Sequence, residues 1–224
     1  MVRTLPSSSQ NHRSPLRTDP SPIVFVIDDD SSLRRAIRRL VQSAGLDVET
    51  LGSVKEFLSA SRLDVPSCII LDVRLPGMSG LDLQRELAAA DVHIPIIFIT
   101  SYGDIPMSVR AMKAGAIEFL PKPFRDQDLL DAVQLALERD RARRQQQADI
   151  RSLRERFQSL TPREREILPL VVSGLLNKQI AAAIGASEAT VKVHRSQLTR
   201  KMAAKSLADL VRMAEKMGVT FQTL

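Results

Sequence analysis

The sequence predicts an α/β domain with a doubly wound (βα)5 parallel sheet, followed by a helical linker and an all-α domain of four helices. Three observations support this fold class. From residue 23 to about residue 138, short apolar runs alternate with segments of helical period, the pattern of βα units around a parallel sheet. Residues 139–159 contain no Pro or Gly. From Leu160 onward the apolar residues follow helical period alone.

The first domain, predicted over residues 23–138, takes five strands and five helices. Its apolar runs predict strands at 23–27, 47–50, 68–71, 95–99 and 117–120. Apolar residues spaced three and four apart predict helices at 32–44, 54–60, 80–90, 106–114 and 126–137. Ligands of such sheets bind at the carboxyl ends of the strands. Residues that follow strands one, three, four and five should therefore converge on one site.

The second segment, residues 139–159, is crowded with Arg, Gln and Glu, which favours a helical linker over a flexible tether. Ile150, Leu153, Phe157 and Leu160 follow spacings of three, four and three, a short seam of the coiled-coil kind. A seam of this length fits a helix that pairs with a second copy, and it fits a solvated helix equally well.

The last domain, predicted over residues 160–224, begins with a capping box. Thr161 and Glu164 are spaced for reciprocal capping, and Pro162 takes the first helical position. Helical period then predicts four helices, at 162–173, 177–184, 188–202 and 207–217. Gly185 and Ala186 form a tight turn between the second and the third of them. Two short helices joined in this way are the arrangement of a helix-turn-helix.

Composition narrows the class of protein. A chain of 224 residues is long enough for two modest domains. No apolar run approaches the roughly 20 residues of a bilayer-spanning helix, so no membrane partner is expected. Residues 1–22 are rich in Ser and Pro and lack the apolar stretch of a secretory signal, which predicts a disordered tail. The single cysteine, Cys68, lies in an apolar run and fits a core position in a reducing cytoplasm.

The formal net charge of +6 is divided unevenly along the chain. Residues 22–137 carry 12 basic and 16 acidic residues, whereas residues 160–224 carry 10 and 5. An acidic module therefore precedes a basic one. A basic domain suits a polyanion such as DNA, although the same balance also fits an ordinary solvated surface.

Polar and charged residues stand where four predicted strands end: Asp28, Asp29, Asp30, Asp72, Thr100 and Lys122. Clustered carboxylates repel one another unless a cation joins them, so this edge predicts Mg²⁺, a hard ion that prefers oxygen ligands. Lys122 and Thr100 would complete a phosphate site, and Asp72 is the expected nucleophile toward a phosphoryl group. Each residue taken alone also fits a cap or a turn former. The Lys122–Pro123 peptide is expected to be cis.

Several segments of the first domain resemble the receiver domain of two-component systems: residues 26–30 (VIDDD), 71–80 (LDVRLPGMSG), 99–100 (IT) and 119–124 (FLPKPF). Residues 103–107 (GDIPM) and 111–116 (AMKAGA) are similar to the FixJ-type subgroup in particular. The resemblance covers residues 23–138. It implies a phosphoacceptor, Mg²⁺ ligands, a switch pair and a phosphate-binding cation. In this chain those are Asp72 as phosphoacceptor, Asp28, Asp29, Asp72 and the backbone carbonyl of Arg74 as ligands, Thr100 and Phe119 as switch pair, and Lys122 as cation.

The last domain resembles the helix-turn-helix of the LuxR/NarL type through residues 160–168 (LTPREREIL), 177–181 (NKQIA) and 190–195 (TVKVHR). Its third helix gathers basic and amide side chains and one valine on a face opposite its apolar stripe, where they could reach DNA bases and phosphates. A solvated helix face is the alternative. The predicted DNA-binding residues are Thr190, Lys192, Val193, Arg195, Ser196, Gln197, Arg200 and Lys201.

Together the two resemblances imply a response regulator transcription factor of the FixJ/NarL type. It would accept a phosphoryl group from a sensor histidine kinase on Asp72 and so control binding to promoter DNA, as a homodimer and as an activator with RNA polymerase as a partner. Its only catalysis would be its own phosphorylation and dephosphorylation. Two alternatives stay open: an aspartate-based phosphotransferase or phosphatase, and a receiver whose basic domain binds a protein.

Overall fold

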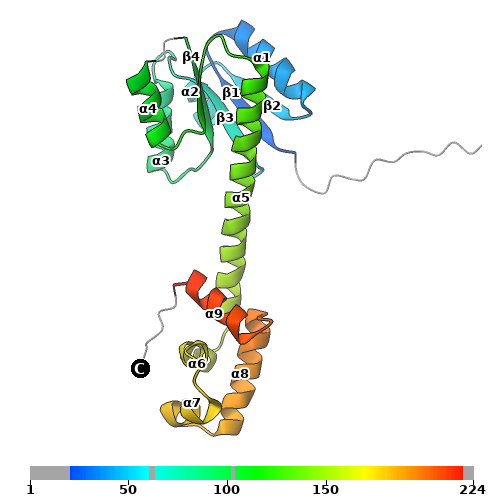
Figure 1. Cartoon of the computed structure of the whole chain (residues 1–224), viewed down its shortest axis with the longest axis vertical. Coiled ribbons are helices and arrows are strands. Elements are labelled where there is room, and N and C mark those ends of the chain that lie inside the picture. Colours follow the sequence, from blue (N-terminus) through cyan, green and yellow to red (C-terminus); the bar gives the residue numbers. More distant parts are fainter. Residues whose placement is uncertain (1–20, 61–63, 102–103, 219–224) are drawn as a thin grey trace, which may run out of the picture. The chain divides into compact units, whose positions relative to one another are not determined.

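The structure is a computed structural model that describes residues 21–60, 64–101 and 104–218. The chain divides into two compact units, with the boundary between Arg141 and Ala142 (Figure 1). The predicted tail, residues 1–22, lies outside the described residues except for its last two. In the described part of the chain, no helix is long and apolar enough to cross a membrane.

The N-terminal unit contains a five-stranded parallel sheet in the order β2-β1-β3-β4-β5. This confirms the predicted doubly wound α/β fold. Each strand lies within one residue of its predicted bounds. The strands are β1 (Ile23–Ile27), β2 (Asp47–Leu51), β3 (Ser67–Asp72), β4 (Ile96–Thr100) and β5 (Glu118–Pro121).

Helices connect these strands and begin at side-chain caps. Asp30, Ser53, Ser79 and Asp104 each accept a hydrogen bond from a backbone N–H of the first turn, which satisfies donors that the helix itself leaves free. The connecting helices are α1 (Ser31–Ser43), α2 (Val54–Ser59), α3 (Gly80–Ala89) and α4 (Ile105–Lys113), and α5 (Asp126–Gln158) follows the last strand.

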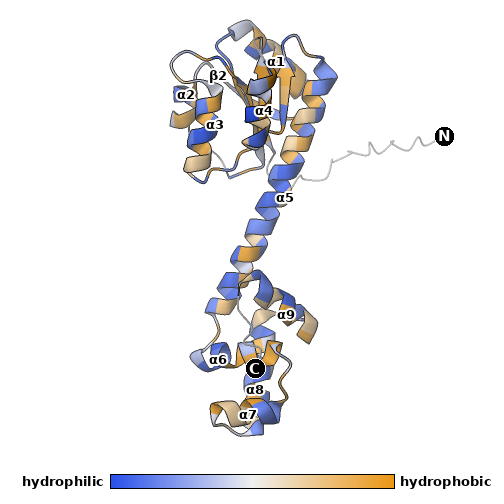
Figure 2. Ribbon diagram, turned by 60° about the vertical axis from the view of Figure 1, so that its left-hand side comes forward, coloured by the Kyte–Doolittle hydropathy of each residue, from blue (hydrophilic) through white to orange (hydrophobic). Residues whose placement is uncertain are grey.

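The sheet is apolar on both faces, as a parallel sheet covered by helices must be. Its strands are largely in the hydrophobic colour in Figure 2. Val24 and Val26 of β1 point to a core shared with α1 and α5. Phe25 and Ile27, which alternate with them along the strand, point to a second core shared with α2, α3 and α4. The strands are therefore held on both faces, and their carboxyl ends are fixed relative to one another.

The sequence predicts a helix that ends at residue 137 and a separate helical linker that begins at residue 139. In the structure, α5 runs through this boundary without a break. Residues 126–158 form one helix of 33 residues. Residues 139–159 contain neither Pro nor Gly to interrupt it, and pairs such as Arg143–Gln147 and Gln145–Asp149 bond one turn apart. Asp140, fully buried, accepts a hydrogen bond from the backbone N–H of Ser67 at 3.0 Å, which ties the helix to the start of β3.

The C-terminal unit is helical, as predicted. After the end of α5 it contains α6 (Pro162–Val172), α7 (Asn177–Ile184), α8 (Glu188–Met202) and α9 (Leu207–Lys216), each within one residue of its predicted bounds. Leu160 belongs to the core of this unit, Phe157 packs against that core, and Leu153 is buried. Three of the four apolar positions of the predicted seam are thus covered within one chain, which leaves little of the seam for a second copy.

Candidate functional site

Four strands deliver their terminal residues to one edge of the sheet. Asp28 follows β1, Asp72 ends β3, Thr100 ends β4 and Lys122 follows β5. The Nζ atom of Lys122 lies 2.7 Å from Oδ2 of Asp28 and 2.6 Å from Oδ2 of Asp72. The convergence predicted from strand order is therefore present. The peptide between Lys122 and Pro123 is cis, also as predicted.

The acidic residues at this edge form a compact cluster. Asp28, Asp29 and Asp72 each offer a carboxylate oxygen, and these oxygens lie within 4.8 Å of one another. Asp28 and Asp72 are buried, whereas Asp29 is exposed. The backbone N–H of Arg74 donates to Oδ1 of Asp72 at 3.0 Å, so the backbone of Arg74 lies next to this acidic cluster. A set of oxygens with one open side suits a hard cation that keeps some of its waters.

Burial and the lysine act in opposite directions on the Asp28 carboxyl. Burial raises the pKa of Asp28; the hydrogen bond from Lys122 and the backbone N–H of Asp30 oppose this, and the net pKa stays above its ordinary value. Burial would lower the pKa of Lys122, but its hydrogen bonds to Asp28 and Asp72 outweigh burial and raise it. Lys122 is accordingly charged at neutral pH and offsets part of the negative charge in the pocket.

The two residues expected to switch lie on neighbouring strands. Thr100 is 1% exposed, and its carbonyl accepts a hydrogen bond from the backbone N–H of Lys122 at 2.8 Å. Phe119 is half-buried and pairs in register with Phe98 of β4, with ring centroids 6.2 Å apart. Phe119 packs against the core on the α4 side of the sheet. Thr100 and Phe119 therefore lie on adjacent paired strands, and Phe119 lies on the side of the sheet that α4 covers.

Gly80 packs against the backbone of the central aspartate. A Cβ atom at this position would lie 2.4 Å from the carbonyl oxygen of Asp72 and 2.9 Å from Cγ of Leu71. The Gly80 N–H donates to the carbonyl of Val73 at 2.9 Å. The first residue of α3 thus holds the end of β3 through contacts that only glycine permits.

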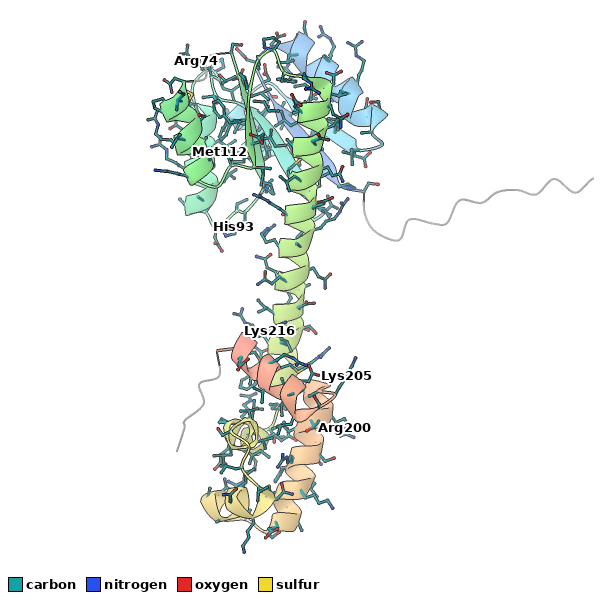
Figure 3. The ribbon with its side chains drawn as sticks, in the orientation of Figure 1. Arg74, His93, Met112, Arg200, Lys205 and Lys216 are labelled. Carbon is teal, nitrogen blue, oxygen red and sulfur yellow. The ribbon has the colours of Figure 1, made fainter. Side chains whose placement is uncertain are left out.

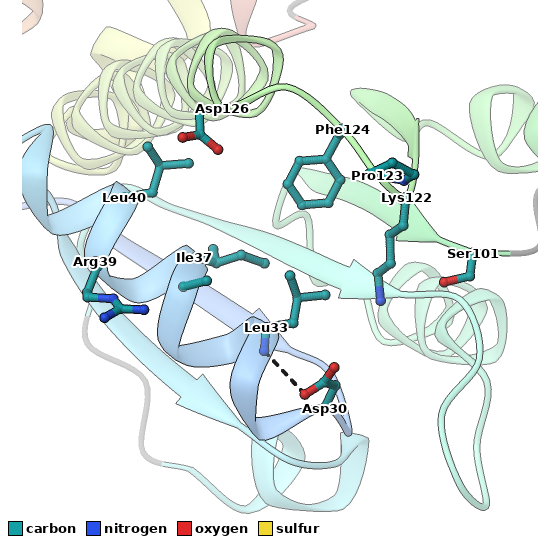
Figure 4. A pocket seen from close by; sticks show the side chains of 11 residues that line it. Asp30, Leu33, Ile37, Arg39, Leu40, Ser101, Lys122, Pro123, Phe124 and Asp126 are labelled. Atoms are coloured by element: carbon teal, nitrogen blue, oxygen red, sulfur yellow. Dashed lines mark hydrogen bonds between the residues drawn. The ribbon is translucent and has the colours of Figure 1, made fainter.

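A cavity of about 730 Å³ opens beside the acidic edge, between α1 and the start of α5 (Figure 4). Leu33, Ile37, Leu40 and Phe124 line it, and Lys122 reaches it from the acidic side. Sequence reasoning missed this cavity. The spacing of apolar residues predicted the helix of α1, but it does not show that Leu33 and Leu40 stay partly exposed.

In the C-terminal unit, α7 and α8 are joined by a tight turn. Gly185 adopts a left-handed conformation with φ of 65°, and Ser187 caps α8 by accepting from the backbone N–H of Thr190. Both features match the predicted helix-turn-helix. Val191 and Leu198 of α8 lie in the core of this unit, so the opposite face of the helix is left to solvent.

The predicted DNA-binding residues of α8 fall into two groups. Six are exposed: Thr190, Lys192, Val193, Ser196, Gln197 and Arg200, the last labelled in Figure 3. Arg195 and Lys201 are only partly exposed and bond within the domain, Arg195 to Asn177 and Lys201 to Glu164. These two internal partners were not found from the sequence.

An acidic pocket at the carboxyl edge of a (βα)5 sheet, in one chain with a helix-turn-helix, is typical of transcription regulators that carry a receiver domain. Residues 24–134 match the family described as "Response regulator receiver domain", and residues 158–214 match "Bacterial regulatory proteins, luxR family". The chain belongs to the response regulators that combine these two domains, and it is a response regulator transcription factor.

Several relatives match nearly the whole chain. Nodulation protein W of Bradyrhizobium diazoefficiens is 56% identical over 88% of this chain and 87% of its own length. Transcriptional regulatory protein FixJ of Azorhizobium caulinodans is 45% identical over 88% and 93%. The solved structure of the response regulator StyR superposes with a TM-score of 0.82 at 51% identity, covering 88% of this chain and all of that one (100%). The predicted FixJ-type resemblance is confirmed.

Proposed function

We propose that a sensor histidine kinase phosphorylates this response regulator on Asp72, and that phosphorylation controls its binding to promoter DNA. The observation that carries the proposal is the position of the Lys122 ammonium, 2.6 Å from Asp72 and 2.7 Å from Asp28. A carboxylate is a weak nucleophile toward phosphorus unless the charge on the transferred oxygens is compensated. Lys122 is placed to provide that compensation.

Mg²⁺ is the proposed cofactor. Asp28, Asp29 and Asp72 supply three carboxylate oxygens within 4.8 Å of one another, and the carbonyl of Arg74 is the proposed fourth protein ligand. Oxygen donors of this kind suit Mg²⁺, which, when bound, neutralises negative charge on phosphoryl oxygens.

In the proposed reaction, a carboxylate oxygen of Asp72 forms a bond to phosphorus while the bond from phosphorus to the nitrogen of the kinase histidine breaks. Lys122 moves one of its hydrogen bonds from Asp72 to a phosphoryl oxygen. Hydrolysis of the phosphoryl group, with water as the nucleophile, restores the carboxylate. The protein's own catalysis is limited to these two steps.

The response to phosphorylation is proposed to run through Thr100 and Phe119 to the face built by α4 and β5. When Thr100 moves toward the phosphoryl group, Phe119 gains space to turn inward. The α4 side of this face exposes apolar side chains, with Ile105 80%, Val109 44% and Met112 42% exposed. Two copies that bury these side chains against each other would bring two basic domains to adjacent half-sites on DNA.

The test of this output is sedimentation of the full chain with and without beryllofluoride, a phosphoryl mimic. We expect a monomer without the mimic and a dimer with it, and we expect Val109→Glu to remain monomeric in both conditions. DNA footprinting under the same two conditions then shows whether occupancy of promoter sites follows dimerisation. A wild-type chain that stays monomeric both with the mimic and on its DNA would rule out the dimer.

Binding of promoter DNA through α8, and activation through contact with RNA polymerase, complete the proposal. Specific duplex binding that weakens steeply with salt supports DNA over a protein as the partner of the basic domain, because cations that contact phosphates release counterions. A small-molecule phosphotransferase is disfavoured because the described connections of the receiver are short and include no domain that would cover a substrate.

A further inference from the structure

Two cations of α8 bond to neighbouring helices of their own domain. Nη1 of Arg195 lies 3.0 Å from Oδ1 of Asn177 and 3.4 Å from the carbonyl oxygen of Leu175. Asn177 is the first residue of α7, and Leu175 lies in the turn before it. Arg195 therefore links the middle of α8 to the start of α7.

Lys201 makes a comparable link at the end of α8. Its Nζ atom lies 2.7 Å from Oε2 of Glu164, whose side chain is fully buried in α6. The same carboxylate oxygen accepts from the backbone N–H of Thr161 at 2.8 Å, so it also caps α6. Leaving a buried carboxylate without a cation would strongly destabilise the fold. The ion pair with Glu164 therefore holds Lys201 in place.

The exposed residues of α8 lie between these two links. At about 100° per residue, the stripe of Lys192, Ser196, Arg200, Val193 and Gln197 covers an arc of about 140° around the helix. Arg195 falls on one flank of this arc and Lys201 on the other. Within the described residues, Lys192 and Arg200 have no side-chain hydrogen bond or ion pair. Cations on one helix thus divide into free ones on the stripe and bonded ones at its edges.

We propose that Arg195 and Lys201 are positioning residues, which fix the rotation of α8 about its own axis and so aim the exposed stripe, and that they do not contact DNA. The proposal rests on the proposed function, in which α8 binds the major groove. Links on both flanks of a helix resist rotation in both senses. A rotation by one residue would move every side chain of the stripe by about 100° and remove it from the groove.

The first test separates positioning from DNA contact by a double-mutant cycle. The probe is a labelled duplex that the wild-type protein, with beryllofluoride, enriches from a random-sequence pool. We expect Arg195→Met and Asn177→Ala each to weaken binding, and the double variant to bind no more weakly than Arg195→Met alone, since both remove one link. Additive losses would mean that Arg195 acts on DNA independently of Asn177 and would overturn the proposal.

Salt dependence provides a second readout from the same variants. A cation that contacts a phosphate contributes about 0.9 to the slope of log affinity against log salt concentration. Loss of a positioning residue should weaken binding and leave that slope unchanged. A slope reduced by about 0.9 in Arg195→Met or Lys201→Met would show a phosphate contact and contradict the assignment.

Lys201 is tested by rescue. Lys201→Met leaves Glu164 buried without its cation, so we expect lower thermal stability and weaker DNA binding. Adding Glu164→Gln removes the buried charge and should restore thermal stability, whereas DNA binding should stay at the level of Lys201→Met, because both changes remove the same link. Additive losses of DNA binding in the double variant would show that Lys201 acts on DNA independently of Glu164 and would overturn the assignment. The DNA affinities are compared only among variants that show a cooperative thermal transition, because that transition shows that they are folded.

A control separates this inference from the function on which it rests. Lys192→Ala removes a cation of the exposed stripe and should weaken binding without lowering thermal stability. If Lys192→Ala and the positioning variants all bind the duplex like wild type, α8 is not the DNA-binding helix and the proposed function fails. If Lys192→Ala alone weakens binding, α8 binds DNA and the positioning role is refuted.

Discussion

The Nζ atom of Lys122 lies 2.6 Å from a carboxylate oxygen of Asp72. The two residues are 50 positions apart and reach each other because β3 and β5 end at the same edge of the sheet. The cation is therefore in place before any phosphoryl group arrives. Phosphorylation of Asp72 would exchange one acceptor of Lys122 for another with little movement of the backbone.

Asp72→Asn is expected to abolish labelling by radioactive acetyl phosphate in the presence of Mg²⁺. The amide keeps the size of the side chain but cannot act as the nucleophile. Asp47→Asn, at the exposed start of β2, is the matched control and should be labelled like wild type. Undiminished labelling of Asp72→Asn would remove Asp72 from this role.

Asp29→Ala is expected to weaken Mg²⁺ binding by at least about tenfold and to reduce phosphorylation with it. Asp29 is the exposed member of the acidic cluster, so its loss should leave the fold intact. Calorimetric titration with Mg²⁺ measures the first effect and acetyl phosphate labelling the second. Asp91→Ala, exposed before β4, serves as control. Unchanged Mg²⁺ dependence in Asp29→Ala would exclude this carboxylate as a ligand.

Lys192→Ala is expected to weaken specific DNA binding by roughly 1 to 3 kcal/mol, the range for a basic side chain that reads the major groove. Lys216→Ala, on the exposed side of α9, should change binding little. Fluorescence anisotropy with the enriched duplex measures both. Equal losses in the two variants would mean that the groove-facing helix is misassigned.

The Glu164–Lys201 pair predicts a pH-dependent stability of the C-terminal unit. Burial raises the pKa of Glu164, but the hydrogen bond and charge of Lys201 and the backbone N–H of Thr161 outweigh it and hold the pKa below its ordinary value of 4.5. Because the folded pKa is the lower one, the pair stabilises the fold above about pH 4.5. This contribution is lost as pH falls through the folded pKa.

Glu164→Gln should therefore destabilise the unit by about 1 to 3 kcal/mol at pH 7, and the difference from wild type should shrink below pH 4.5. Urea titrations of the full chain, followed by the amide NMR signals of α6 and α8, measure this difference. A difference that stays constant between pH 7 and pH 3.5 would show that the charge of Glu164 contributes nothing.

Much of the acidic site could be predicted because its geometry follows from strand order. Parallel strands end at one edge, so Asp28, Asp72 and Lys122 had to meet once their strands were recognised. The pleat of a strand likewise puts neighbouring residues such as Val24 and Phe25 on opposite faces of the sheet. Both results follow from the geometry of a parallel sheet once its strands have been located in the sequence.

The internal partners of α8 could not be predicted in the same way. Arg195 bonds to a residue 18 positions earlier and Lys201 to one 37 positions earlier. No periodicity shows whether a cation on a helix turns to solvent or to a buried carboxylate. The continuity of α5 is different, because the absence of Pro and Gly between residues 126 and 158 was visible in the sequence. Two helices were predicted because a domain boundary was expected near residue 138, but one helix can cross such a boundary.

Gly80 takes no part in the proposed chemistry, yet its missing side chain is what allows the end of β3 to lie where it does. Any larger residue at this position has to displace the carbonyl of Asp72, and with it the carboxylate on the same residue. Substitution of Gly80 is therefore expected to impair the proposed phosphorylation of Asp72 even though the nucleophile itself is kept. A receiver can in this way lose its response through a residue that carries no functional group.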